Sequence, residues 1–156
     1  MRFEGPILTL ECNESSYAID IGAVQEILDV RPIKPLPNTP AYLLGMIDLR
    51  GINVPVADLR LLLGGSAAAD QPSTRILVTS VRSDGINHII GLRCDRVIEV
   101  TQIDEGTLAS IDSADLLHWS DAGMAGMARV KSTPVALIDL DRLFAALGNS
   151  PLAVAG

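Results

Sequence analysis

The sequence predicts a mainly β protein made of two small, similar barrels. Short strand-like runs separated by Gly and Pro fill most of its 156 residues. Apolar residues make up 48% of the chain and aromatic residues only 3%, so the predicted core is aliphatic. A long stretch of the sequence also occurs twice, which predicts two half-domains of the same fold. Closure into barrels would hide the edges of such short strands.

The stretch Gly45–Leu63 predicts a β-hairpin followed by a short helix. It reads GMIDLRGINVPVADLRLLL, with strand-like runs on both sides of the polar hinge Arg50–Asn53. Pro55 lacks an amide donor, so its strand is expected to be an edge strand or bulged. Asp58 is expected to cap the leucine-rich helix, which Gly64 then ends.

The same pattern returns as GMARVKSTPVALIDLDRLF over Gly126–Phe144. Six positions match in order at one constant offset: Gly45 and Gly126, Met46 and Met127, Val54 and Val135, Asp58 and Asp139, Leu59 and Leu140, Leu62 and Leu143. A second similarity, at a slightly shorter offset, relates Ala23–Ile27 to Arg96–Val100. The hinges differ, since Lys131–Ser132 stands where the first copy has Arg50–Gly51. A shared pattern with a changed hinge predicts one fold with a specialised site on the first copy.

Before this hairpin the pattern predicts mostly extended chain. Strands are expected at Pro6–Cys12 and Tyr17–Ile19, with a turn at Asn13–Ser16 between them. Asp20 is expected to cap a short helical or irregular segment that places Val24, Ile27 and Leu28 on one side. The three prolines of Arg31–Pro37 favour an extended chain. Thr39–Pro40 is expected to start a single helical turn, with Thr as the cap.

After the hairpin the pattern of strands resumes behind a linker. A linker is expected at Gly64–Ser73. Two strands, Arg75–Val81 and His88–Cys94, are expected around the turn Ser83–Gly85. An irregular region is expected at Thr101–Ala125 and a loose tail at Asn149–Gly156. A last helix is predicted after Asp139, because Leu140, Leu143, Phe144 and Leu147 recur with helical spacing before Gly148. We expect that helix to pack across the body of the protein.

Composition excludes several classes of function. The net charge of −7 and the few aromatic residues argue against a nucleic-acid partner. The N-terminus does not resemble a signal peptide, and no apolar run reaches membrane-spanning length, so a cytoplasmic protein without membrane insertion is expected. Cys12 and Cys94 are expected to be buried and reduced. Neither His88 nor His118 has ligand partners at metal spacing, so no metal and no cofactor is predicted.

These residues resemble the CheW family of bacterial chemotaxis coupling proteins. The resemblance rests on YAIDIGAVQEI (Tyr17–Ile27), PLPNTPAYLLG (Pro35–Gly45) and GMIDLRGINVPVADLR (Gly45–Arg60), with further support from GLRCDRVIEV and DLDRLF. It implies one domain over residues 1–150, made of two SH3-like five-stranded β-barrel subdomains with short helices and a C-terminal helix. The subdomains would span roughly residues 15–70 and 75–150 with strand exchange, followed by a flexible tail at 151–156.

The resemblance also implies a function and partners. The family is non-catalytic and bridges the cytoplasmic tip of methyl-accepting chemoreceptors to the regulatory domain of a CheA-type histidine kinase. The protein is then expected to be a monomer alone and to join rings with the kinase. Two alternatives stay open: an adaptor of a non-flagellar pathway, such as surface attachment or pilus motility, and a small-ligand-binding barrel protein.

The residues implied in partner binding are Val24, Glu26, Arg50 and Gly51, in a groove between the subdomains. Arg50 precedes Gly51, which tolerates positive φ at a tight hinge. A Glu26–Arg50 pair would either orient a planar guanidinium for a partner or lock the local fold as a surface salt bridge. Val24 would be either a core residue or an exposed apolar contact.

Overall fold

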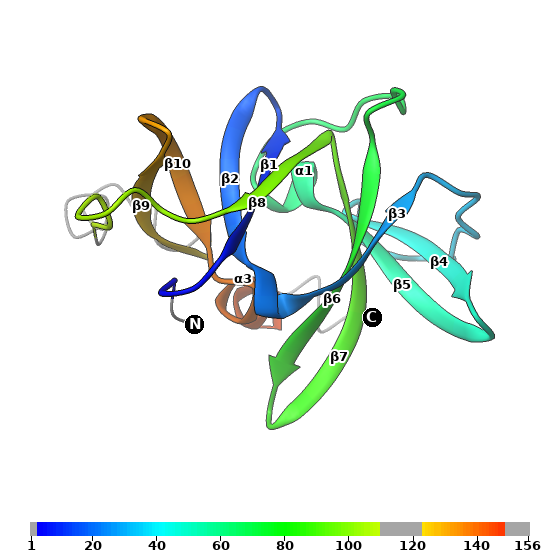
Figure 1. Cartoon of the computed structure of the whole chain (residues 1–156). Helices are drawn as coiled ribbons and strands as arrows, with labels where there is room; N and C mark the ends of the chain where they lie inside the picture. Colours follow the sequence, from blue (N-terminus) through cyan, green and yellow to red (C-terminus); the bar gives the residue numbers. More distant parts are fainter. Residues whose placement is uncertain (1–2, 110–122, 149–156) are drawn as a thin grey trace.

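The computed structural model describes residues 3–109 and 123–148, and these residues form two five-stranded mixed sheets (Figure 1). Sheet A has the strand order β8-β1-β2-β10-β9, and sheet B has the order β3-β6-β7-β5-β4. The predicted mainly β fold with five strands in each unit is confirmed. The strands are β1 (Ile7–Cys12), β2 (Ser15–Asp20), β3 (Val24–Asp29), β4 (Leu43–Leu49), β5 (Ile52–Asp58), β6 (Arg75–Ser83), β7 (Ile86–Cys94), β8 (Arg96–Thr101), β9 (Met124–Val130) and β10 (Thr133–Ile138).

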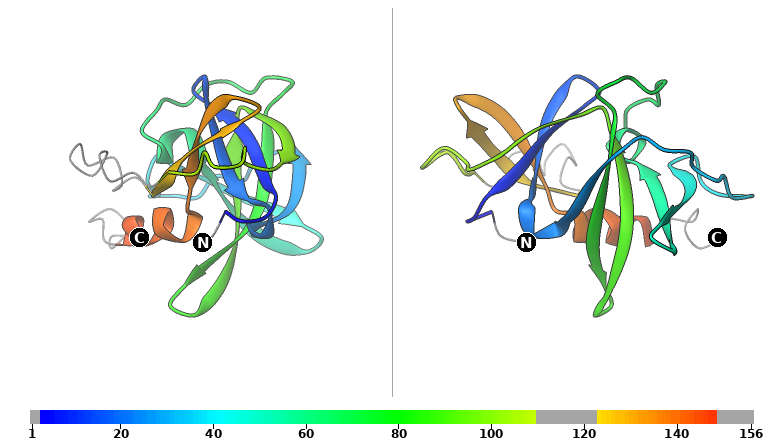
Figure 2. Two further views of the ribbon diagram at one scale, coloured as in Figure 1. Left: turned by 60° about the vertical axis from the view of Figure 1, so that its left-hand side comes forward. Right: turned by 45° about the vertical axis from the view of Figure 1, so that its right-hand side comes forward.

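The two sheets exchange hairpins. The β1–β2 hairpin begins the first copy of the repeat but pairs with β8 and β10, whereas β6–β7 begins the second copy and pairs with β3 and β5. The pairings β2–β10 and β5–β7 are parallel, and the others are antiparallel. The sheets therefore do not follow the two halves of the sequence. The β6–β7 hairpin is also the longer one, and its tip extends beyond the rest of the molecule (Figure 2).

The predicted repeat corresponds to two copies of one hairpin–helix unit. In the first, β4 and β5 lead into α1 (Leu59–Leu62); in the second, β9 and β10 lead into α3 (Leu140–Gly148). Both hinge residues have positive φ in each copy, 52° and 86° for Arg50 and Gly51, and 50° and 68° for Lys131 and Ser132. This pair of left-handed residues is typical of two-residue hairpin turns. The repeat thus extends to the backbone of the turn, although only one copy has a glycine there.

Two local predictions are wrong, the first because strand pairing overrides the local pattern. Val24–Asp29 is the strand β3 paired with β6, and only Ile21–Ala23 is helical, as a 3₁₀ turn capped by Asp20. The Thr39 hydroxyl donates to the carbonyl oxygens of Leu36 and Leu43 and does not cap a helix; the chain makes one turn there.

Of the two alternatives predicted for Pro55, the edge strand is wrong, because β5 lies inside its sheet between β7 and β4. The ladder of β5 with β4 does contain a register shift, between Leu43 and Gly45. The register of β5 with β7 begins at Val56, immediately after the proline. The missing donor of Pro55 therefore falls outside the paired segment on that side. Between β8 and β9, residues 102–109 form turns and a bridge from Ala109 to Met127. The rest of the predicted irregular region up to residue 122 and the predicted tail at 149–156 lie outside the described residues.

The core consists of one shared apolar cluster and one smaller cluster within each sheet. The sheet A cluster includes Ile7, Val135 and Leu137, and the sheet B cluster includes Ile47, Val56 and Ile76. The shared cluster draws on both sheets and on α1 and α3: Leu8, Leu10, Ile19, Leu59, Leu77, Leu92, Ile138, Leu140 and Leu143 are among its buried members. Burial of this aliphatic surface is the main force that holds the sheets together.

The C-terminal helix packs across the molecule as predicted. Helix α3 follows a strand of sheet A but lies against β6 of sheet B (Figure 1). Its Leu140 and Leu143 are buried in the shared cluster, and Phe144 packs against it. The Oδ1 atom of Asp141 also accepts a hydrogen bond of 2.8 Å from the amide of Arg82 in β6.

Gly45 is expected to be intolerant of any side chain. Its φ is +143°, and a Cβ atom added there would lie 2.1 Å from the carbonyl oxygen of Lys34, which bridges to β4 through Met46. Gly45→Ala should lower the free energy of unfolding by about 2 kcal/mol or more, measured by urea denaturation. Gly64→Ala is the matched control, because Gly64 has φ +85° but open space around it, and about 1 kcal/mol is expected there. Equal losses in both variants would show that the approach of Lys34 is unimportant.

Candidate functional site

The predicted Glu26–Arg50 pair forms at one end of sheet B. Arg50 donates from its two terminal nitrogens to the two carboxylate oxygens of Glu26, over 3.1 and 2.8 Å. Glu26 comes from β3 and Arg50 from the β4–β5 turn, so the pair joins the two edge strands of sheet B. The Arg50 side chain is 71% exposed and that of Glu26 is 32% exposed. The pair therefore closes the sheet and also presents a guanidinium to solvent.

The charges of this pair stabilise each other. The hydrogen bonds from Arg50 lower the pKa of Glu26 below its ordinary value of 4.5, and the charges of Arg50 and Arg31 act in the same direction. The hydrogen bonds with Glu26 raise the pKa of Arg50. Both groups are thus held in their charged forms near neutral pH. Two parallel bonds to a carboxylate also fix the plane of the guanidinium.

The two other predicted site residues lie in the same region. Val24 and Glu26 are partly buried residues of β3. The register of β3 with β6 shifts between them, so Val24 packs against the shared core cluster, whereas Leu28 belongs to the sheet B cluster. Gly51 is exposed at the turn, and its amide donates to Oδ1 of Asp48 over 2.9 Å. Val24 is therefore a half-buried strand residue, and Gly51 serves the turn that positions Arg50.

A second ion pair occupies the equivalent place in sheet A. Lys131 donates to the two carboxylate oxygens of Glu99 over 2.7 and 3.0 Å, and it joins the β9–β10 turn to the edge strand β8. Glu99 is the counterpart of Glu26, and Lys131 that of Arg50, at the same two offsets that relate the copies of the repeat. Applying both offsets to the predicted pair would have found it in the sequence. Each sheet thus has one ion pair across its edges.

Asp104 holds the second turn in place of a glycine. Its carboxylate accepts hydrogen bonds from the amides of Lys131 and Ser132, over 2.9 and 2.8 Å. These bonds lower the pKa of Asp104 below its ordinary value of 3.8. Two left-handed residues with side chains are costly at a turn, and the carboxylate offsets part of that cost.

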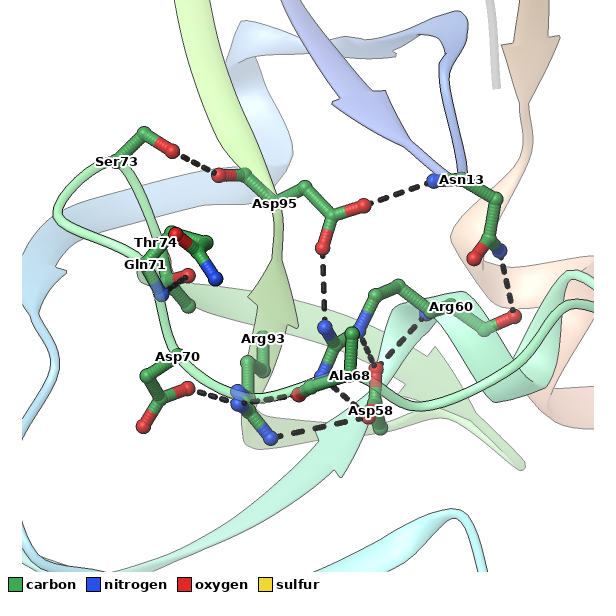
Figure 3. Close-up of polar contacts among 10 residues, drawn as sticks. All are labelled: Asn13, Asp58, Arg60, Ala68, Asp70, Gln71, Ser73, Thr74, Arg93 and Asp95. Atoms are coloured by element: carbon green, nitrogen blue, oxygen red, sulfur yellow. Dashed lines mark hydrogen bonds and ion pairs between the residues drawn. The ribbon is translucent and has the colours of Figure 1, made fainter.

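A network of buried charges lies near the shared core and was not predicted from the sequence (Figure 3). Arg60 binds both carboxylate oxygens of Asp58 over 2.9 Å and reaches Oδ1 of Asp95 over 3.1 Å. Asp58 also caps α1 as predicted, by accepting from the amide of Arg60 over 3.0 Å. The Asp58 and Arg60 side chains are 0% and 1% exposed. Arginine at the second position of a helix carries no sequence signal for burial, so this role could not be anticipated.

The outer part of the network attaches the linker before β6. Arg93 of β7 donates to the carbonyl oxygen of Ala68 over 3.1 Å, pairs with Asp70, and lies 4.0 Å from Asp58. Burial is the main cause that lowers the pKa of Arg93, and the charge of Arg60 adds to it. The hydrogen bonds with Asp58 instead raise the pKa of Arg60.

The family profile of the CheW-like domain matches residues 6–148. The chain belongs to the CheW family. The chemotaxis protein CheW of Rhizobium meliloti is 28% identical over 141 residues, covering 88% of this chain and 86% of the relative. The chemotaxis protein CheW of Thermotoga maritima is 26% identical over 143 residues, covering 90% and 87%. The crystal structure of the scaffolding protein TtCheW from Thermoanaerobacter tengcongensis superposes with a TM-score of 0.72 at 29% identity, covering 89% of this chain and 91% of the other.

CheW family membership makes this chain a non-catalytic scaffold protein. Within the described residues no group of three or more His, Cys, Asp or Glu side chains is placed to hold a metal ion. Among the helices that the structure describes, none is long and apolar enough to cross a membrane. His88 is exposed on β7, and His118 lies outside the described residues.

The two arginine–carboxylate pairs should differ in their effect on stability. Arg60→Ala would remove both guanidinium hydrogen bonds of the buried Asp58 and leave only Arg93 at 4.0 Å, so we expect the free energy of unfolding to fall by about 3–5 kcal/mol. Arg50→Ala removes a solvent-exposed pair and should change it much less. Urea denaturation of the two variants measures this difference. A similar effect of the two substitutions would contradict the contrast between a buried and an exposed pair.

The pKa of Glu26 should depend on Arg50. A carbon-detected NMR titration is expected to give Glu26 a pKa below 4.5 in the wild type, and a value shifted back toward 4.5 in Arg50→Ala. Because the folded pKa is the lower one, the pair stabilises the protein above the unfolded pKa and loses this contribution as the pH falls through the folded value. An unchanged pKa in the variant would mean that the pair does not persist in solution.

Proposed function

We propose that this CheW family protein is an adaptor that couples methyl-accepting chemoreceptors to a CheA-type histidine kinase in a bacterial chemosensory array. The observation that carries the proposal is that the match to chemotaxis CheW proteins covers nearly the whole chain in both sequence and fold. Its partners are the cytoplasmic receptor tip and the regulatory domain of the kinase. It acts in the cytoplasm as a monomer that joins rings with the kinase.

The proposed partner surface centres on Arg50, together with Glu26, Gly51 and Val24. Arg50 is the more exposed member of its ion pair. Two N–H groups of its guanidinium donate to Glu26, and a guanidinium has five, so others are left to donate to a partner. Glu26 holds the guanidinium plane in one orientation, which reduces the entropy lost when a partner binds. The exposed side chain of Ile52, 64% accessible, follows Gly51 and adds an apolar contact beside the charge. A charged anchor next to an apolar one suits an amphipathic receptor helix.

This surface has a structural role as well. Because Glu99–Lys131 repeats the geometry in sheet A, closing the edges of a sheet is the shared task of the two pairs. Exposed ion pairs contribute little to stability. The planar, bidentate guanidinium distinguishes the first copy from the second, where lysine provides a compact point charge. We therefore assign partner recognition to the first pair.

The mechanism is positional. The adaptor holds receptor and kinase at fixed places on one scaffold, so that a shift of the receptor changes the kinase through two coupled interfaces. Such interfaces are expected to be modest in area and reversible. An adaptor of a non-flagellar pathway would use the same surfaces with other partners. A small-ligand-binding barrel, the remaining alternative, is favoured by no particular feature of the described residues.

Co-sedimentation tests the adaptor proposal. The full chain is mixed with an arrayed chemoreceptor signalling fragment and a CheA-type kinase from the same cell, and kinase activity is followed with and without the chain. Chain-dependent recruitment and activation of the kinase are expected. Failure to recruit either cognate partner would refute the coupling role.

A charge swap separates the two roles of the Glu26–Arg50 pair. Arg50→Glu alone should abolish the pair and weaken receptor binding at least about tenfold, as loss of a central charged anchor does. The double variant Glu26→Arg, Arg50→Glu can re-form the pair with reversed polarity. If Arg50 contacts the receptor, the double variant stays weak. Restored binding, measured by the same sedimentation, would instead assign the pair a purely structural role.

A further inference from the structure

We infer that Arg60 is a positioning residue that fixes the angle between the two sheets, and that coupling of receptor to kinase depends on this angle. The second half of this inference rests on the proposed adaptor function. The first half concerns the isolated chain and can be tested without partners.

Arg60 contacts the point where the chain passes from sheet B to sheet A. It belongs to α1, directly after β5 of sheet B. Its partner Asp95 is the single residue between β7 of sheet B and β8 of sheet A. The other carboxylate oxygen of Asp95 accepts from the amide of Asn13, in the β1–β2 turn of sheet A, over 2.8 Å. The Asn13 side chain in turn donates to the carbonyl oxygen of Arg60 over 3.3 Å (Figure 3).

These contacts form a closed loop that includes both sheets. Starting from Arg60, the loop passes through Asp95 to Asn13 and returns to the backbone of Arg60. Asp58 fixes the guanidinium at the start of the loop with two further bonds. A closed loop of directional bonds constrains rotation of one sheet against the other. The shared apolar cluster cannot do this alone, because hydrophobic burial is non-directional.

The burial of the network supports a geometric role over a stabilising one. Arg60 is 1% exposed and Asp58 is fully buried, so both charges lose their hydration. Buried ion pairs are often no more stabilising than apolar side chains of similar volume, and their best-attested use is to specify one geometry. Apolar residues in place of both Asp58 and Arg60 could also fill this space next to the shared core. The guanidinium therefore contributes directional hydrogen bonds, whereas methionine or leucine would contribute only packing.

A weaker contact between a helix and the opposite sheet occurs at the equivalent place in the second copy of the repeat. Asp141 is the counterpart of Arg60 at the offset of the hairpin–helix repeat, and it lies in α3, the helix that follows β10 of sheet A. Its carboxylate accepts from the amide of Arg82, in β6 of sheet B. Each helix thus sends the side chain at this position to the other sheet. The Arg60 contacts with Asp95 and Asn13 are partly buried and several in number, whereas Asp141 makes one hydrogen bond that is exposed to solvent, so the larger effect is expected at Arg60.

Arg60→Met tests the inference, with Arg142→Met as the matched control. Methionine fills much of the volume of arginine but donates no hydrogen bonds, and Arg142 is an exposed arginine of α3. Spin labels at Asn53→Cys in sheet B and Thr133→Cys in sheet A report the distance between the sheets. Both sites are exposed. The native Cys12 and Cys94 are buried, and burial raises the pKa of both thiols, that of Cys94 to about 12, so they should resist labelling.

Two results are expected for Arg60→Met. The distance distribution between the labels should shift or broaden, while Arg142→Met keeps the wild-type distribution. In unlabelled protein, separate binding of receptor and kinase should stay within about twofold of wild type, whereas kinase activation in the complete assembly should fall at least about fivefold, the size of a typical coupling between sites. A wild-type distance distribution in folded Arg60→Met would overturn the role of Arg60. An altered distribution with full kinase activation would overturn its link to coupling.

Asp95→Asn keeps the experiment decisive if Arg60→Met does not fold. It leaves the Asp58–Arg60 pair intact and weakens only the link to sheet A, through a side chain that is 34% exposed. Intermediate broadening of the same distance is expected, and an unchanged distribution would overturn the inference. The distance measurements need no partner, so their outcomes are independent of the adaptor proposal. That proposal fails if the wild-type protein recruits no partner.

Discussion

The pairing of the first hairpin with strands late in the sequence is the constraint on which the rest of the fold depends. The β1–β2 hairpin pairs with β8 and β10, so the strands of sheet A come from both sides of sheet B in the sequence. Sheet B is formed by the residues between them, 24–94. This exchange places both crossings of the chain close to the shared apolar cluster. The buried charges of Asp58 and Arg60 and the partly exposed Asp95 lie at the junction of the sheets, where one misplaced strand would leave a buried charge unpaired.

The two ion pairs across the sheet edges have a different character. Each joins an edge strand to the turn of the opposite hairpin, Glu26 to Arg50 in one sheet and Glu99 to Lys131 in the other. Open sheet edges are a liability, and an exposed pair of charges keeps them closed and discourages pairing with another chain. The connections before β4 and β9 also bridge to those strands, through Lys34 and Ala109. The repeat therefore preserves edge protection, while the type of cation differs between copies.

This division between a rigid junction and exposed edges suits an adaptor of the CheW family. Under the proposed function, partner contacts at the edges can be exchanged without loss of the fold, since exposed pairs contribute little to stability. The relative placement of two partners depends instead on the buried junction, which no partner needs to touch. In such a scaffold recognition and positioning can change independently, because the residues that carry them lie on different parts of the molecule.

The strand pattern, the repeat, the cap at Asp58 and the Glu26–Arg50 pair could all be predicted from the sequence. These depend on local chemistry, on hydrophobic spacing, or on a resemblance carried by continuous motifs. That Val24–Asp29 is a strand follows from the fold alone, because its pairing with β6 outweighs an ambiguous local pattern. The exchange of hairpins and the burial of Arg60 likewise involve residues far apart in the chain, such as Asn13 and Asp95. Whether an arginine lies in solvent or in a core depends on which segments the fold brings around it, and its own neighbours in the sequence do not contain that information.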